Sequence, residues 1–318
     1  ERSPTLAVRR NVRAMRISRR TSSFGGLSAA TLFASLVIGG LSPAAPVNAQ
    51  ESVLDFFSIL PAKPQLKTPE ISGAPIGPSD EMKQARQAYQ SGDFASARGY
   101  LEHASAKGDI VASWYLGHMY RLGRGVPASL SKAYHYYSVV AEAFTPDEPD
   151  PRRLRIMIDA LVRVADIYRK GDPDEGLARN FPVAFQLYNT ASSYGHPAAH
   201  HAEGLMILKG QGVKANPSKG LKWLILAAKK RYPPAEALLG DLYWKGEIVK
   251  RDRVRGLMWY TLATQSARPE ENPEIFDRLT SMQGQASEEQ RLSAEKRAAE
   301  WAEKYPLPPP APGGWDPS

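Results

Sequence analysis

Glycine pairs at a constant spacing constrain the fold of this chain more than any other feature. Three stretches align with one another: WYLGHMYRLGRGV (114–126), AEGLMILKGQGV (202–213) and ALLGDLYWKGEIV (237–249). The matched glycines are Gly117, Gly204 and Gly240, then Gly123, Gly210 and Gly246, with Gly125 and Gly212 closing the first two turns. Matches between the last two copies are 36 residues apart. Because a period of about 20–50 residues is the signature of repeat architectures, we expect a stack of similar units.

Each unit is predicted to be a pair of helices. Four polar residues suited to helix N-caps stand four positions before a small residue: Ser129, Asn180, Asn216 and Asp252, followed by Ala133, Ala184, Gly220 and Gly256. Their side-chain oxygens can accept a hydrogen bond from a free backbone N–H at the start of a helix. A large apolar residue follows one turn later: Tyr137, Tyr188, Leu224 and Tyr260. We therefore expect the small positions to let the paired helices approach closely, with the large side chains packed beside them.

The stretch GQGVKANPSKG (210–220) raises the question of a phosphate-binding loop. Such loops follow a strand and carry glycines at Gly-x-x-x-x-Gly-Lys-Ser/Thr or Gly-x-Gly-x-x-Gly spacing. Here a predicted helix precedes the glycines, and a similar turn recurs as GRGV at 123–126. These glycines are therefore predicted to provide left-handed backbone where the first helix of each pair ends.

Helical units are predicted throughout residues 80–304, which gives an all-α fold, an α/α superhelical solenoid. Besides the three aligned copies, a shorter copy occupies 85–109 and one with an insertion occupies 161–195, so there are about five helix–turn–helix units. The last helix is expected at 286–305, where Ser287 and Gln290 fit a capping box. Its apolar stripe consists of Ala294, Ala298, Trp301 and Tyr305. We expect this helix to cap the end of the array, a partner-docking helix being the alternative.

The two ends of the sequence differ from the helical region. Residues 1–49 combine seven arginines with an apolar stretch, LSAATLFASLVIGGL (27–41), and the small residues Val47 and Ala49 precede Gln50. This pattern is typical of a secretory signal, so we expect export with cleavage near Ala49, an uncleaved anchor being the alternative. Residues 50–79 are predicted to be a proline-rich linker, and residues 305–318 a proline-rich tail.

Charge and cysteine content argue against several classes of function. The net charge is +8, but residues 1–49 hold seven of the 41 basic and one of the 33 acidic side chains, which leaves 34 against 32. Since the rest of the chain is nearly neutral overall, we expect no nucleic-acid binding through a wide basic face. With no cysteine, the chain has no disulfide, no thiolate nucleophile and no cysteine-ligated zinc.

The stretches ASWYLGHMYRLGRGV (112–126) and SKAYHYYSVVA (131–141), with the two later copies, resemble Sel1-like repeats, which are related to tetratricopeptide repeats. The agreement of glycine, cap and aromatic positions carries the resemblance. Glu203 in place of the usual leucine and Ile248 in place of the second turn glycine depart from the pattern. The resemblance implies a protein that binds other proteins, without enzymatic activity and without a small-molecule cofactor.

A narrower resemblance covers the unit that carries the insertion and the one after it. ALVRVADIYRKG (160–171) and NFPVAFQLYNTASSYGHPAAHHAEGLMILKGQGVKANP (180–217) are similar to rhizobial Sel1-repeat regulators of exopolysaccharide production. This resemblance implies a periplasmic negative regulator in two-component signalling. Its partners would be the extracytoplasmic domain of a membrane sensor histidine kinase and the periplasmic proteases that remove the regulator. A scaffold for an envelope or polysaccharide-secretion complex is the alternative, and an enzyme such as a wall hydrolase is a third hypothesis.

The partner-binding residues are predicted at positions of the first helices that vary between copies. In helical solenoids this face lines a concave groove. Exposed aromatic and arginine side chains on such a face are typical binding anchors. The predicted residues are Tyr115, His118, Arg121, Arg163, Asp166, Arg169, Leu205, Asp241 and Trp244. The alternative is that about half of them are only solvated.

Three residues of HPAAHHAE (196–203) are of metal-ligand types on adjacent turns of one helix. His196, His200 and Glu203 could in principle hold zinc. However, Pro197 stands where the His-Glu-x-x-His motif of metalloproteases has its catalytic acid. We therefore expect polar residues at the helix start and on the surface, and no metal site.

Overall fold

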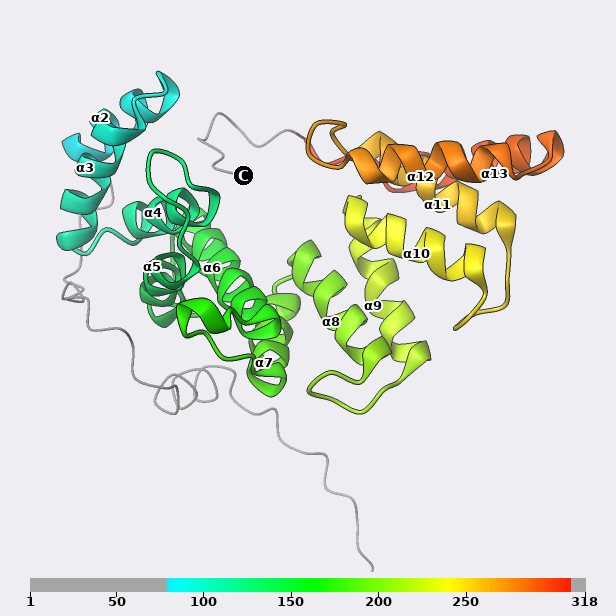
Figure 1. The fold of residues 1–318 in the computed structure, drawn as a ribbon, viewed down its shortest axis with the longest axis horizontal. Helices are drawn as coiled ribbons and strands as arrows, with labels where there is room; N and C mark the ends of the chain where they lie inside the picture. Colours follow the sequence, from blue (N-terminus) through cyan, green and yellow to red (C-terminus); the bar gives the residue numbers. More distant parts are fainter. Residues whose placement is uncertain (1–78, 310–318) are drawn as a thin grey trace, which may run out of the picture. The chain divides into compact units, whose positions relative to one another are not determined.

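A computed structural model describes residues 79–309, and this part of the chain is helical (Figure 1). Its helices are α2 (Asp80–Gln90), α3 (Phe94–Ala106), α4 (Ile110–Leu122), α5 (Leu130–Glu142), α6 (Pro151–Lys170), η1 (Pro173–Glu175, a 3-10 helix), α7 (Phe181–Ser193), α8 (Pro197–Lys209), α9 (Pro217–Lys229), α10 (Pro233–Lys245), α11 (Arg253–Ser266), α12 (Pro273–Gly284) and α13 (Glu288–Lys304). Residues 79–309 contain no strand, so the predicted all-α class is confirmed. None of these helices is both long and apolar enough to cross a bilayer. The predicted export signal (1–49), nearly all of the linker and the end of the tail lie outside the described residues.

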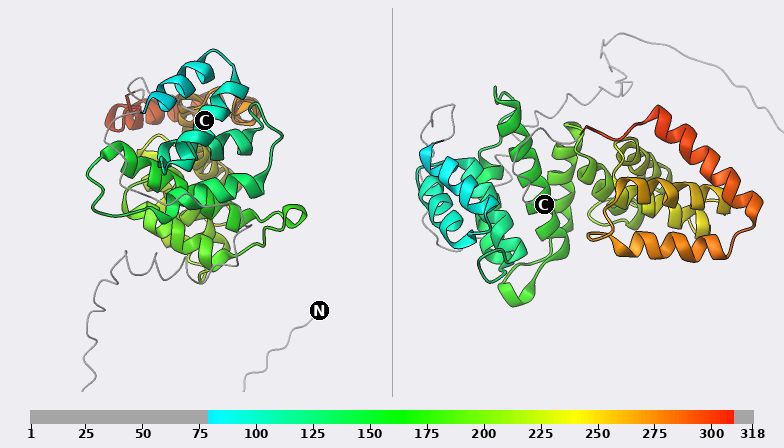
Figure 2. Two further views of the ribbon diagram at one scale, coloured as in Figure 1. Left: turned by 90° about the vertical axis from the view of Figure 1, so that its left-hand side faces the viewer. Right: turned by 90° about the horizontal axis from the view of Figure 1, so that it is seen from above.

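The helices pack as successive pairs. Each helix from α2 to α11 contacts the next one in the sequence, and α8–α9 and α10–α11 are the most extensive pairs. Figure 2 shows the same neighbouring helices from two further sides. The five predicted units correspond to the pairs from α2–α3 to α10–α11, and α13 returns to pack against α11.

Two helices differ from the sequence expectation. Helix α6 begins at Pro151, well before residue 161, where the repeat pattern starts. Asp150 caps this helix by accepting a hydrogen bond from the backbone N of Arg152 (2.8 Å), and proline is favoured at the first helical position. Helix α12 was not anticipated as a separate element. Helix α6 packs against α5 and α7 and also contacts α4.

The turn glycines have the predicted left-handed backbone. Gly123, Gly210 and Gly246 follow α4, α8 and α10 with φ of 68°, 67° and 75°. At Gly212 (φ 71°) space also excludes a side chain, because a Cβ would lie 2.5 Å from the backbone oxygen of Phe181. A helix precedes and follows each turn, whereas a phosphate loop would follow a strand. The prediction of structural turns is confirmed.

The predicted N-caps are confirmed as well. The side-chain oxygens of these caps each accept a hydrogen bond from the backbone N–H three residues later: Ser129, Asn180, Asn216 and Asp252. The insertion before α7 adds a cap that the sequence did not reveal. Glu175 accepts hydrogen bonds from the backbone N of Leu130 (2.9 Å) and of Ser131 (2.7 Å). Since the first N–H groups of a helix have no partner within it, Glu175 fastens the insertion to the start of α5.

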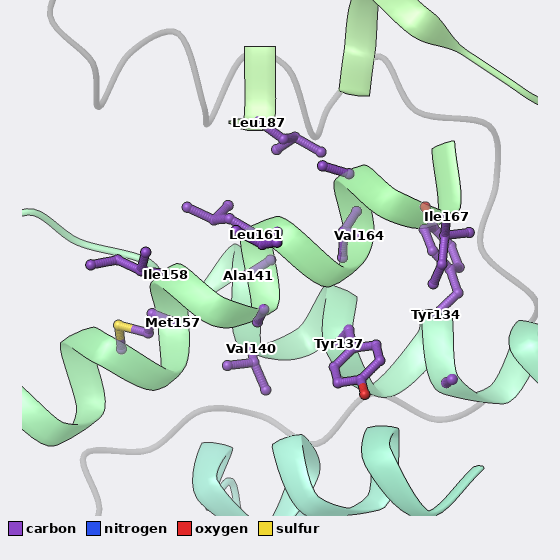
Figure 3. Close-up of a cluster of buried hydrophobic side chains, with 14 of the residues drawn as sticks. Tyr134, Tyr137, Val140, Ala141, Met157, Ile158, Leu161, Val164, Ile167 and Leu187 are labelled. Carbon is purple, nitrogen blue, oxygen red and sulfur yellow. The ribbon is translucent and has the colours of Figure 1, made fainter. Parts of the chain in front are cut away.

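The small and large positions meet inside each pair as predicted. Tyr137, Tyr188 and Leu224 are completely buried. A Cβ on Gly117 would come within 2.6 Å of the Tyr137 ring, so the glycine is what lets α4 and α5 approach. Figure 3 shows apolar side chains of α5 and α6 in one cluster with Leu187 of α7.

A second cluster of buried side chains lies among α9–α13. Ala294 and Ala298 of α13 are buried there, and the ring of Trp301 packs on Trp259 of α11 at 4.8 Å between centroids. The predicted capping box between Ser287 and Gln290 is present at the start of α13. The apolar stripe of α13 is therefore covered by the chain's own α11.

Candidate functional site

The predicted partner-binding residues fall at three equivalent positions of the first helices α4, α6, α8 and α10. The structure separates them into two groups by exposure. Six are partly exposed: Arg121, Arg163, Asp166, Arg169, Leu205 and Asp241. Tyr115, His118 and Trp244 are only 6%, 1% and 6% exposed. The expectation that these three are exposed anchors is wrong.

Neighbouring helices cover the three buried residues. The ring of Tyr115 lies 6.3 Å from that of Tyr89 in α2. His118 faces Asp159 in the first half of α6, the part of the helix that the repeat pattern did not predict. In α10, the backbone N of Trp244 lies 3.2 Å from where a Cβ on Gly256 would stand, so Trp244 is packed tightly against α11.

Asp159 is the centre of a buried polar cluster. Its carboxylate accepts a hydrogen bond from the indole N–H of Trp114 (2.7 Å) and lies 3.1 Å from Arg163 Nη2. Two imidazoles stand slightly farther away: the Nε2 atoms of His118 and His196 are 3.6 and 3.8 Å from the carboxylate oxygens. We call these five residues the Asp159 cluster. It joins α4, α6 and the start of α8.

The ionisation of the Asp159 cluster follows from its burial and its one arginine. Burial alone would raise the pKa of Asp159, but Arg163 and His118 outweigh it, and the pKa lies below its usual range. Burial lowers the pKa of both His118 and His196, against the opposite effect of Asp159. At neutral pH the cluster is therefore a carboxylate–guanidinium pair flanked by neutral imidazoles.

The three candidate zinc ligands do not converge. The expectation of surface residues is wrong for His200 and Glu203, which are buried. His200 Nε2 lies 3.0 Å from the backbone oxygen of Ser192, and Glu203 accepts a hydrogen bond from Asn189 Nδ2 (3.2 Å). Both contacts are made with α7, whereas His196 faces the Asp159 cluster. No three His, Asp or Glu side chains between residues 79 and 309 stand in metal-binding geometry.

A second, more exposed polar cluster lies farther along α6. Tyr188 donates a hydrogen bond to Asp166 Oδ1 (2.7 Å). Arg169 donates a hydrogen bond to the hydroxyl oxygen of Tyr188 through Nε (3.2 Å) and another to Asp166 Oδ1 through Nη2 (3.4 Å). In α10 the equivalent of Asp166 is Asp241, which pairs with Arg278 of α12 at 3.4 Å. The face that these residues share is thus rich in fixed, opposite charges.

Sequence reasoning found this face but missed Asp159 and the aromatic hydroxyl of Tyr188 as its polar partners. Tyr188 was assigned to the core, where its ring does lie. Asp159 sits in the stretch RIMIDALV (155–162), an acid among apolar residues on a helix. A buried carboxylate requires a partner, so that stretch could have signalled the cluster.

Acid is expected to destabilise the fold through four buried or half-buried histidines, His118, His196, His200 and His201. Burial, and next Arg169, lower the pKa of His201 to about 4, whereas an unfolded histidine titrates near about 6.5. A lowered folded pKa means that protons favour the unfolded chain, so stability falls as the pH drops below the unfolded value. Between pH 7.5 and pH 5, protonation of this residue alone should lower the free energy of unfolding by about 1–2 kcal/mol. Urea unfolding followed by circular dichroism measures this change.

A His201→Gln variant should lose less stability than the wild type over the same pH range, because glutamine cannot take up the proton that His201 binds on unfolding. The pKa values of His118, His196 and His200 are also lowered by burial, so a slope remains. Identical pH slopes for the variant and the wild type would show that the pKa of His201 is not lowered in the folded chain.

Comparison with known proteins agrees with the repeats. The Sel1 repeat family matches residues 110–142, 158–196, 197–232 and 233–266. These segments coincide with α4–α5, most of α6 with α7, α8–α9 and α10–α11. The structure of a Sel1 repeat protein from Oxalobacter formigenes superposes with a TM-score of 0.50 at 22% identity, covering 70% of this chain and 83% of that one. At this identity the likeness shows the fold alone.

Two curated proteins match about half of the chain. The "Exopolysaccharide production negative regulator" of Rhizobium leguminosarum bv. viciae is 32% identical over 163 residues, which is 51% of this chain and 60% of that protein. The protein of the same name from Rhizobium meliloti (strain 1021) is 32% identical over 154 residues, 48% of this chain and 57% of the relative. The match thus spans less than two thirds of either relative. The chain thus carries four Sel1 repeats, each folded as a helix pair, in an all-α superhelical fold.

Proposed function

We propose that the chain is a periplasmic regulator that binds the extracytoplasmic domain of a membrane sensor histidine kinase and thereby represses exopolysaccharide production. The observation that carries this proposal is the similarity to two rhizobial proteins named negative regulators of that process. The arginine-rich, then apolar pattern of residues 1–49 supports export. Sel1 repeats, like other helical repeats, offer an extended surface to partner proteins.

The exposed part of the first-helix face suits protein binding better than catalysis. Its charges are held in place, as in the Asp166–Arg169 and Asp241–Arg278 pairs. Side chains already fixed by such pairs lose little further freedom when a partner binds. Leu205 stands at the position equivalent to Asp166 and Asp241 and is partly exposed, so it offers an apolar contact among the charges.

Repression follows if the regulator binds one conformation of its partner more tightly. A ligand shifts a two-state equilibrium only by its difference in affinity for the two states. A preference of about a hundredfold for the inactive kinase, equal to about 2.7 kcal/mol, would lower the active-to-inactive ratio by the same factor. Removal of the regulator would restore the kinase to its unbound equilibrium.

A Leu205→Asp substitution is expected to weaken binding of the purified kinase domain at least about tenfold, because it puts a charge where an apolar contact is made. Affinity is measured by calorimetry with the isolated extracytoplasmic domain. The matched control is Leu226→Asp: this leucine is 39% exposed on α9, a second helix of a pair. The control should bind within about twofold of the wild type.

The same pair of variants tests repression in cells. A strain that lacks the regulator should produce more exopolysaccharide, and Leu226→Asp should restore the normal level whereas Leu205→Asp should not. Unchanged exopolysaccharide in the deletion strain would overturn the proposed function. Normal signalling together with co-purification of several envelope proteins would favour a scaffold instead.

A further inference from the structure

The near neutrality of the helical region hides a strongly basic segment. Residues 204–235 contain six lysines and Arg231, and no Asp or Glu. Three of these lysines lie at the end of α8, in the α8–α9 turn and at the start of α9. They are Lys209, Lys214 and Lys219, and all three are exposed.

The same three positions are basic in the next repeat. Thirty-six residues further on stand Lys245, Lys250 and Arg255, also exposed. In stacked helix pairs, the turns from first to second helix lie at the same end of each pair, and α9 packs against α10. The two turns therefore share one edge of the array. We call its lysines the lysine edge: Lys209, Lys214, Lys219, Lys245 and Lys250.

Within the described part of the chain, the lysine edge makes no short-range contact with an acid, although Lys219 acts electrostatically on the carboxyl of Glu203. No ion pair or side-chain hydrogen bond between residues 79 and 309 involves any of the five ammonium groups, whereas the neighbouring Arg255 pairs with Asp252 at 3.3 Å. Exposed cations grouped in this way raise the local concentration of anions. The edge is thus a positive surface of five ammonium groups, and its turns carry one exposed acid, Glu247, beside Ile248.

An exposed apolar residue lies within this surface. Ile248 replaces the second glycine of the α10–α11 turn, between Lys245 and Lys250, and is 41% exposed. An apolar side chain flanked by long cationic ones suits the boundary between lipid headgroups and acyl chains. Lysines act as flexible point charges rather than bidentate forks, which suits the diffuse field of anionic lipids better than one carboxylate partner.

We propose that the lysine edge, together with the exposed Ile248, binds the anionic headgroups of a phospholipid bilayer. The ammonium groups contact lipid phosphates while the isoleucine enters the headgroup region. This surface consists of turn residues and helix ends, whereas Leu205, the residue that tests partner binding, lies within α8 and outside the lysine edge. The two proposals can therefore fail independently.

A site-specific label on the full chain tests the proposal. Since the sequence has no cysteine, an Ile248→Cys variant can carry one polarity-sensitive fluorophore. We expect its emission to shift to the blue with vesicles of phosphatidylglycerol and phosphatidylcholine in equal parts, and not with phosphatidylcholine alone. High salt should reverse the shift, because it screens exposed charges. The same label in Tyr194→Cys, an exposed site at the end of α7, should stay in water.

Charge variants identify the groups responsible. Combined Lys209→Ser, Lys214→Ser, Lys245→Ser and Lys250→Ser changes should weaken vesicle binding of the labelled chain at least about tenfold. The matched control replaces four exposed lysines elsewhere by serine: Lys229, Lys230, Lys296 and Lys304. This control should weaken vesicle binding by less than about twofold.

Three results would overturn the proposal. The first is the absence of any shift at position 248 with phosphatidylglycerol, and the second is an equal shift at position 194. The third is an equal loss of binding in the two charge variants. Binding of polyglutamate through the lysine edge without binding of vesicles would assign the surface to an acidic protein segment instead.

Discussion

Replacing Gly240 by valine is expected to destabilise the fold by about 3 kcal/mol. A Cβ on this glycine would stand 2.4 Å from Cδ2 of Tyr260 and 3.2 Å from the backbone oxygen of Gly256. Neither neighbour has room to move, since Tyr260 is 4% exposed and Gly256 belongs to the facing helix. The pair α10–α11 must therefore separate. Urea unfolding followed by circular dichroism measures the loss.

The cost should be concentrated near the substitution, because each repeat contacts only its neighbours. Amide hydrogen exchange should quicken in α10 and α11 and change little in α2–α5. Gly99→Val is the matched control: Gly99 lies in α3 with nothing within 4 Å of its Cβ position, so valine there should alter stability by less than about 0.5 kcal/mol. Similar losses for both variants would contradict close packing at Gly240.

Local sequence chemistry was sufficient to predict the helix pairs. The turn glycines, the polar caps and the small and large positions each act within one pair, over a short stretch of chain. Asn216, for example, caps α9 through the backbone N–H of Lys219, three residues away (3.0 Å). Such contacts depend on residue type and spacing alone, and the repetition of the pattern in successive copies made each assignment firmer.

Contacts between pairs were less accessible from the sequence. His118 was expected on the surface because it occupies a variable position of a first helix. It is instead buried against Asp159. Asp159 is distant in sequence from its partners on α4, for example 45 residues from Trp114, so no local pattern connects them. The covering turns of α6 precede the region where the repeat pattern is visible. A residue can follow the repeat rule and still be buried by a segment that does not.

Averages over the chain concealed the lysine edge for a similar reason. The helical region is nearly neutral as a whole, yet the segment 204–235 has seven cations and no acid. Comparing the charge of each repeat with that of its neighbours, instead of the whole region, would have revealed the pattern. Ile248 was noticed only as a departure from the repeat, and its exposure gives that departure a physical meaning.

Replacing Asp159 by alanine is expected to cost about 3–4 kcal/mol, because it leaves the partly buried guanidinium of Arg163 without its counter-charge. The indole N–H of Trp114 would lose its acceptor at the same time. Asp166→Ala is the matched control on the same helix, since this carboxylate also pairs with an arginine but is 33% exposed against 13% for Asp159. The control should cost about 1 kcal/mol.

The electrostatic origin of this loss can be separated from a simple cavity in two ways. The pKa of Asp159 is lower in the folded chain than the unfolded value near about 4. Its contribution to stability is therefore present above that value and is lost as the pH falls. The free energies of unfolding of variant and wild type should differ by about 1 kcal/mol less at pH 3 than at pH 7. Adding Arg163→Met to Asp159→Ala should recover part of the stability, since no unpaired charge then remains. A loss that is independent of pH and unchanged by the second substitution would mean that Asp159 acts only by filling space.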